Sequence, residues 1–245
     1  MSVPVTDELL EELRKFDTPS VTNVVATYPS NPICLGLYHP WTQYWYTDHS
    51  LRCWYPELGP VVGYAVTCVY GLPDPTYGHL GFPDVVEAVE RAPKPVVLII
   101  EQRFPSEIAG KVGLSGGNMT SALKAVGCTG VLTNGPSRDI DEIRGMGIQY
   151  LTSGVTPGHG PTAVHAVNVP VHIAGMDVAP GEIVHMDENG AVKFPADRIG
   201  EVLTRVQQLK REEETQQAAL QHAKSAAEIR AILMGHSYGK AKRGE

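Results

Sequence analysis

Apolar positions along the chain follow two different periods. Apolar residues at every third or fourth position predict amphipathic helices over residues 6–16, 18–28, 82–92, 117–126, 140–147 and from 197 onward. Short apolar runs rich in β-branched residues predict strands over residues 61–70, 96–100, 130–133, 148–152, 183–186 and 191–194. The run over 96–100 is apolar throughout, which is typical of the centre of a sheet. Strands that alternate with helices in this way predict an α/β fold with mixed sheets.

One segment, residues 113–139, combines a glycine turn, a helix, a buried strand and an Arg-Asp pair. Its helix is expected to begin near Gly117 or Asn118 and to stop at Gly127. The first turn of a helix leaves backbone N–H groups unpaired, and Gly116 and Gly117 carry no side chain that would block a ligand. The sequence therefore predicts an anion site at the start of this helix.

Arg138 and Asp139 emerge after the strand of this segment, beyond a cluster of turn residues. An ordinary structural role is open to each: Asp139 can cap the next helix, and Arg138 can form an ion pair with a neighbour. Glu101 follows the apolar run over 96–100 and is either a solvated strand end or a site residue. The local pattern leaves these alternatives open.

Composition and charge narrow the class of protein. The chain has 245 residues, enough for one sizeable domain, and a net charge of -7 that argues against a nucleic-acid-binding surface. No window of 18 apolar residues suggests a membrane span, and the four cysteines show no C-x-x-C spacing. We expect a reduced, cytoplasmic protein that binds neither nucleic acid nor membrane.

The motifs of the central segment resemble those of a known family. The run from Gly117 to Asp139, followed by DEIRGMGIQYLTSGVTP, is similar to the regulator-of-ribonuclease-activity-like (RraA-like) family, and the similarity covers most of residues 12–215. That family includes metal-dependent 4-hydroxy-4-methyl-2-oxoglutarate aldolases and oxaloacetate decarboxylases. The resemblance implies the swivelling β/β/α fold of phosphohistidine-type domains, assembled as a homotrimer or hexamer with the active site at a subunit interface. It places an RraA-like α/β/β domain at 1–210 and a C-terminal helical extension at 211–245 that packs on a neighbouring subunit.

The resemblance also implies a reaction, in which cleavage of a C–C bond in a 2-oxo acid generates the enolate of pyruvate. Because no lysine lies in the central motif in a setting that lowers its pKa, a divalent cation is favoured over a Schiff base. Asp139 would be the oxygen ligand of Mg²⁺ or Mn²⁺, and Arg138 would stabilise charge on the substrate. Four residues at the start of the helix would bind the substrate carboxylate: Gly116, Gly117, Asn118 and Met119.

Acid–base residues are harder to assign. His159 lies in a glycine turn after a strand and is our candidate for proton transfer or substrate contact. The resemblance implies a glutamate from the C-terminal helix of a neighbouring subunit that acts through water on the metal, and Glu213 matches best among three consecutive glutamates. Many aldolase members have acidic residues where this chain has Asn118 and Asn134, so the acid–base partner is relocated to His159 or Glu101, or the preferred reaction differs.

Other interpretations remain open at this point. Four histidines over residues 159–185 lack the spacing of a zinc site, and no glycine-rich nucleotide motif is present. The aromatic-rich stretch over 29–60 is either an irregular packed excursion or a subunit contact. Within the family, the alternative to a lyase is a non-catalytic regulator that binds a ribonuclease, or a related metal-dependent lyase or hydrolase acting on a different small acid.

Overall fold

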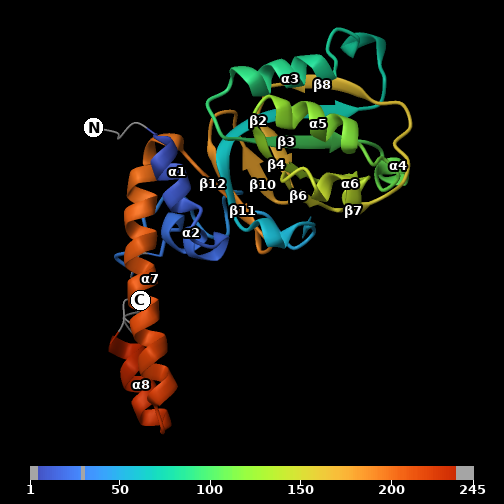
Figure 1. The fold of residues 1–245 in the computed structure, drawn as a ribbon. Helices are drawn as coiled ribbons and strands as arrows, with labels where there is room; N and C mark the ends of the chain where they lie inside the picture. Colours follow the sequence, from blue (N-terminus) through green and yellow to red (C-terminus); the bar gives the residue numbers. More distant parts are fainter. Residues whose placement is uncertain (1–4, 29–30, 236–245) are drawn as a thin grey trace.

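The computed structural model describes residues 5–28 and 31–235, and its central feature is an eight-stranded mixed sheet (Figure 1). The strands follow the order β1-β6-β4-β3-β2-β11-β12, with β8 paired to β2 off this path. Their bounds are β1 Arg52–Cys53, β2 Val61–Gly71, β3 Val96–Arg103, β4 Cys128–Thr133, β6 Gln149–Thr152, β8 Ala163–Val167, β11 Ile183–Asp187 and β12 Gly190–Phe194. Strands β2, β3, β4 and β6 run parallel and the other four are antiparallel to their neighbours. The predicted α/β class with mixed sheets is confirmed.

Strand β2 is long enough to pair with two different strands along one edge. Its first residues pair with β11 and its last with β8, while β3 pairs along the opposite edge. Helices α3 (Phe82–Arg91), α5 (Gly117–Ala125) and α6 (Ile140–Arg144) cover one face of the sheet. The hairpin of β9 (Val171–Ile173) and β10 (Met176–Val178) covers the other.

Alternation along β3 explains this two-sided burial. Leu98 and Ile100 pack under α3 and α5, whereas Val97 and Ile99 pack against the β9–β10 hairpin, and all four are fully buried. The remaining short elements are α4 Ser106–Ala109, β5 Pro136–Ser137, β7 Gly154–Val155, η1 Pro56–Leu58, η2 Pro75–Tyr77 and η3 Ala196–Arg198. Because β5 pairs with β7, the segment that carries Arg138 and Asp139 is held beside the end of β6.

A third core lies where helices pack on β11 and β12. It joins α1 (Asp7–Leu13), α2 (Thr18–Val25) and the first half of α7 (Ile199–His222), whose predicted apolar stripe at Val202, Val206 and Leu209 is buried. Helix α8 (Ala226–Gly235) begins after Ser225, whose Oγ accepts the N–H of Glu228. Figure 1 shows α8 and the end of α7 extending away from the sheet. The domain boundary at 210 falls within α7 and stays a prediction.

Three helix ends differ from the sequence prediction, and the first is that of the helix predicted over 6–16, which ends at Leu13. The helix predicted over 18–28 ends at Val25, because Ala26 forms a β-bridge with Tyr38. The helix predicted to reach residue 147 ends at Arg144. Among the described residues, no helix is long and apolar enough to cross a bilayer.

The aromatic-rich stretch is packed on the core at some of its residues, and its role as a subunit contact stays a prediction. Trp45 and Tyr55 are fully buried, whereas Trp41 is 82% exposed and Tyr44 is 61% exposed. Regular structure between residues 31 and 60 is limited to β1 and η1. The stretch is therefore an irregular excursion that is anchored in the core at some aromatic residues and presents others on the surface.

A buried histidine in β11 should make stability depend on pH. His185 is fully buried, its Nδ1 lies 2.9 Å from Thr18 Oγ1, and burial lowers its pKa to about 4 although Asp187 opposes the shift. In the unfolded chain the His185 imidazole is protonated near pH 6.5, whereas in the folded chain it is protonated only near pH 4. The free energy of unfolding therefore falls as the pH drops from 6.5 towards 4. Between pH 7.5 and 5.0 we expect the free energy of unfolding to fall by about 2 kcal/mol from this group.

Urea unfolding of wild type, His185→Gln and His222→Gln at both pH values tests this expectation. His222 is exposed at the end of α7 and serves as the matched control. The His185 substitution should remove most of the pH-dependent loss and the His222 substitution should not. Equal pH dependence in all three proteins would show that another group is responsible.

Candidate active site

The start of α5 meets a carboxylate from a distant part of the chain. Gly116 is the N-cap residue of α5, and the Gly117 N–H donates to Asp139 Oδ2 at 3.1 Å. Asp139 immediately precedes α6 but makes no capping bond to it, and its backbone is left-handed with φ 59°. The interpretation of Asp139 as the cap of the following helix is therefore wrong. Its carboxylate reaches back to the start of α5, where the helix dipole favours negative charge.

Arg138 faces the same point. Its Nε lies 3.4 Å from Asp139 Oδ2, and both side chains are about one-third exposed at 33% and 37%. A Cβ built on Gly116 would overlap Asp139 Oδ2 and lie 2.9 Å from Arg138 Nε. Glycine is required at this position because the two functional side chains occupy the space that a larger residue would fill.

Hydrogen bonds fix the two backbone segments that carry these groups. Arg138 N–H donates to the Ser115 carbonyl at 3.1 Å, and Ser137 Oγ donates to the same carbonyl at 2.6 Å. The Tyr150 hydroxyl lies 2.7 Å from both Ser115 Oγ and Thr120 Oγ1, in a fully buried network. The site is thus preorganised by groups that are themselves buried and paired.

Gly116 and Arg138 line a cavity of about 380 Å³, whereas Asp139 and Gly117 lie against them and are not part of its lining. Five residues that the sequence analysis assigned to the site line this cavity: Gly116, Asn118, Met119, Arg138 and His159. The His159 Nδ1 atom lies 2.6 Å from the Gly160 carbonyl oxygen. Because a carbonyl only accepts, Nδ1 carries the hydrogen and Nε2 of the neutral ring is the free acceptor. The structure thus brings His159 to the same cavity as Arg138.

One acidic residue at this point was not assigned from the sequence. The carboxylate of Glu142, in the first turn of α6, contacts Gly117 so closely that a Cβ there would overlap it. Glu142 lies in the run DEIRGMGIQYLTSGVTP that resembles the family, so the signal was present in the sequence. Two carboxylates, those of Asp139 and Glu142, therefore contact Gly117.

These two carboxylates fit a hard divalent cation. Across the described residues, no three His, Cys, Asp or Glu side chains are grouped closely enough to hold a metal by themselves. Mg²⁺ commonly keeps several waters and takes only one or two protein carboxylates, so Asp139 and Glu142 suffice for such an ion. The fit is specific to oxygen ligands and would not suit a structural zinc.

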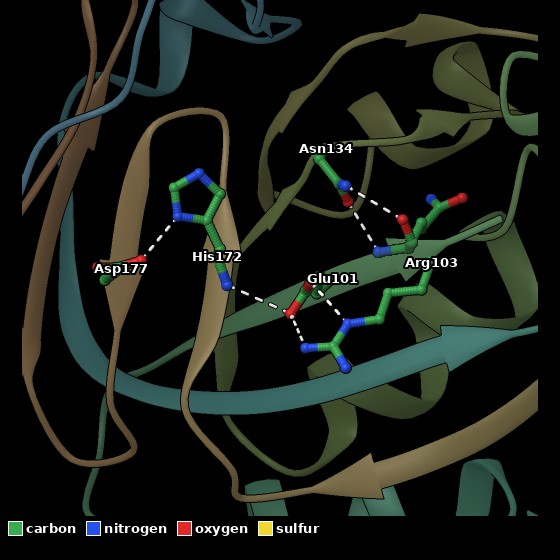
Figure 2. Close-up of polar contacts among 6 residues, drawn as sticks. Glu101, Arg103, Asn134, His172 and Asp177 are labelled. Atoms are coloured by element: carbon green, nitrogen blue, oxygen red, sulfur yellow. Dashed lines mark hydrogen bonds and ion pairs between the residues drawn. The ribbon is translucent and has the colours of Figure 1, made fainter. Parts of the chain in front are cut away.

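Two other candidate residues lie elsewhere. Glu101 accepts Nε and Nη2 of Arg103 at 2.8 and 3.0 Å and the His172 N–H at 3.2 Å, on the face covered by the β9–β10 hairpin (Figure 2). Glu213 lies on α7 and does not line the cavity; burial and then Asp17 raise its pKa. Within one chain, neither residue joins the Arg138 site.

Asn134 has a structural role that an aspartate could not reproduce. Its Oδ1 accepts the Gln102 N–H at 2.7 Å and its Nδ2 donates to the Gln102 carbonyl at 3.1 Å (Figure 2). A carboxylate has no hydrogen to donate at neutral pH. The Asn134 side chain therefore links the turn after β4 to the end of β3. The other asparagine, Asn118, is exposed and lines the cavity.

Comparisons with known proteins identify the family of this chain. A family model described as "RraA-like: Aldolase/RraA" matches residues 40–193, which is more than half of the chain. A 4-hydroxy-4-methyl-2-oxoglutarate aldolase of Thermus thermophilus is 31% identical over 91 residues, which are 37% of this chain and 56% of that protein. The matched regions cover between 25% and 69% of the length of the curated relatives, and about half of most of them.

Solved structures share the fold at low sequence identity. A Pseudomonas syringae protein of unknown function superposes with a TM-score of 0.71 at 21% identity, covering 94% of this chain and 96% of that one. Streptomyces coelicolor RraAS2, described as an unusual member of the RNase ES inhibitor RraA family, gives 0.66 at 19% identity, covering 88% and 98%. These likenesses establish the fold alone.

Proposed function

Because the chain belongs to the RraA-like family, we propose that it is a divalent-metal-dependent lyase that cleaves a C–C bond of a 2-oxo acid. The observation that supports this most strongly is the convergence of Arg138, Asp139 and the start of α5 beside one cavity. Aldol cleavage of 4-hydroxy-2-oxo acids and decarboxylation of oxaloacetate both require stabilisation of the same anion. In both, electrons from the broken bond flow into the 2-oxo group and form the enolate of pyruvate.

Binding of the 2-oxo acid is assigned to α5 and Arg138. The Gly117 amide is already occupied by Asp139, so the amides of Asn118 and Met119 remain in the first helical turn for the substrate carboxylate. The guanidinium of Arg138 would donate to the oxygen on which negative charge develops. Because this charge is larger in the transition state than in the substrate, the interaction accelerates cleavage and does not merely tighten binding.

Asp139 and Glu142 would hold Mg²⁺ or Mn²⁺. When bound, the cation supplies a Lewis acid for the 2-oxo oxygen. The Gly117 N–H and Arg138 fix the orientation of the Asp139 carboxylate in advance. This orientation limits the reorganisation required during the reaction.

His159 would move the proton in the aldol reaction. Its free Nε2 can accept the proton of the 4-hydroxyl group as the bond between C3 and C4 breaks, which leaves an aldehyde or ketone and the enolate. Protonation of the enolate at C3 then gives pyruvate. In oxaloacetate decarboxylation no hydroxyl proton has to be removed, so His159 is expected to matter less.

Assembly remains part of the proposal. We place Glu213 of the partner subunit near the cavity in a homotrimer or hexamer, as the family resemblance implies. A non-catalytic regulator is the alternative, and it would need neither the carboxylate pair nor the proton acceptor.

Pyruvate release tests the proposed reaction directly. With Mg²⁺ present, purified protein should release pyruvate from 4-hydroxy-2-oxopentanoate, 4-hydroxy-2-oxoglutarate or oxaloacetate in an assay coupled to lactate dehydrogenase. EDTA added before the coupling step should reduce the rate by about 100-fold or more, and excess Mg²⁺ should restore it. Rates equal to those of buffer for all three acids would favour the regulator.

A further inference from the structure

Much of the cavity wall is apolar. Six lining residues form this apolar wall, which is contributed by β2, the loop before α3, α3, the segment before α5, α5 and β8: Tyr70, Leu80, Phe82, Leu114, Met119 and Val164. Tyr70, Leu114 and Val164 are buried, while Leu80 is 38% exposed at the edge. A substrate group that extends past the reacting carbons would rest on this surface.

Permanent positive charge in the cavity lining comes from a single residue of the described chain. Among the described residues that line it, Arg138 is the one with a permanent positive charge, and its Nε is already 3.4 Å from Asp139. The polar side chains beside the apolar wall, Tyr70 and Thr162, carry hydroxyl groups. Burial raises the pKa of Tyr70 further above its usual value, so this hydroxyl stays neutral.

The Tyr70 hydroxyl also lacks a partner. It is buried and forms no hydrogen bond with any described residue. A buried hydroxyl without a partner is unfavourable. A carboxylate placed on the apolar wall would find the neutral hydroxyl groups of Tyr70 and Thr162 and no permanently charged cation, which does not offset the loss of its hydration.

We propose that this cavity selects 2-oxo acids that carry a single carboxylate and an uncharged, largely apolar group beyond the reacting carbons. This inference rests on the proposed function and narrows its substrate class. It sets the chain apart from a 4-hydroxy-4-methyl-2-oxoglutarate aldolase, whose named substrate carries two carboxylates.

A matched pair of ligands tests the selectivity without requiring turnover. The two ligands, 2-oxopentanoate and 2-oxoglutarate, have the same chain length, but the first ends in a methyl group and the second in a carboxylate. Both are titrated in the presence of Mg²⁺. Isothermal titration should show binding of 2-oxopentanoate tighter by about tenfold or more. Equal affinity, or tighter binding of 2-oxoglutarate, would overturn the proposed selectivity.

A variant that adds a second arginine to the cavity lining provides a further test of the selectivity. Leu80→Arg places a guanidinium at the exposed edge of the apolar wall, so the affinity ratio should shift towards 2-oxoglutarate by about tenfold. Leu72→Arg is the control, because Leu72 is 40% exposed and does not line the cavity. The Leu72 variant should keep the wild-type ratio, and an equal shift in both variants would contradict the assignment of the wall.

Cleavage rates separate this inference from the proposed function. The matched substrates are 4-hydroxy-2-oxopentanoate, which yields pyruvate and acetaldehyde, and 4-hydroxy-2-oxoglutarate, which yields pyruvate and glyoxylate. We expect kcat/KM to favour the first in wild type and the preference to narrow in Leu80→Arg. Release of pyruvate from neither acid would refute aldol cleavage, while the binding comparison would still decide the selectivity. A preference for the dicarboxylate would refute the selectivity and leave the reaction standing.

Discussion

Substitution of Asp139 by asparagine is expected to reduce pyruvate release by about 1,000-fold while the fold is retained. Asparagine has nearly the same shape, and its amide oxygen can still accept the Gly117 N–H that Asp139 accepts at 3.1 Å. The change removes the negative charge that faces Arg138 and the anionic oxygen that would hold the cation. Loss of one preorganised electrostatic group in an active site commonly costs about 100- to 1,000-fold in rate, and loss of metal binding adds to this.

Asp141→Asn provides the matched control for this experiment. Asp141 is an exposed carboxylate in the first turn of α6, two positions from Asp139, and unlike Asp139 it does not contact the Gly117 N–H or the Arg138 guanidinium. Steady-state kcat/KM with saturating Mg²⁺, together with circular dichroism, should show normal folding in both variants and normal activity in Asp141→Asn alone. Comparable activity of the two variants would remove Asp139 from the mechanism.

Replacement of Gly116 by alanine is expected to lower activity by at least about 100-fold through steric displacement. The backbone at Gly116 is extended, with φ -137° and ψ -169°, so alanine fits the local conformation without strain. Its methyl group would instead overlap the Asp139 carboxylate and crowd Arg138 Nε. Both side chains would have to move away from the start of α5, which separates the groups that act together.

Gly110→Ala is the corresponding control. Gly110 lies at the C-terminus of α4, has a negative φ, and has no atom within 4 Å of the position that a Cβ would occupy. Measured kcat/KM should fall for the Gly116 variant only, with both proteins folded by circular dichroism. Full activity of Gly116→Ala would mean that Arg138 and Asp139 work from positions other than those seen here.

Features set by local sequence were predictable. The apolar spacing around α5, the continuous apolar run in β3 and the Asn-Gly hairpin after β11 each depend on residues near one another in the chain. The sequence also identified Gly116 and Arg138 as neighbours of one site. Helix ends were less predictable, since a bridge between Ala26 and Tyr38 decided where α2 stops.

Features set by distant contacts were not predictable in the same way. Whether Asp139 caps α6 or reaches Gly117 depends on how two segments 22 residues apart are placed, and the local pattern allows both. The contact between Glu142 and Gly117 and the apolar wall from β2, α3 and β8 likewise require the folded sheet. The role of Asn134 is similar, because its partner, Gln102, lies in another strand.

Exchange of the pyruvate methyl hydrogens with solvent tests the central claim most directly, because it reports the enolate whatever the physiological substrate is. Proton NMR of pyruvate in D₂O with Mg²⁺ and wild-type protein should show the methyl signal disappearing much faster than in buffer. Asp139→Asn and EDTA-treated protein should leave the signal close to the buffer rate. A methyl signal that persists equally with wild-type protein, the variant and buffer would contradict the account.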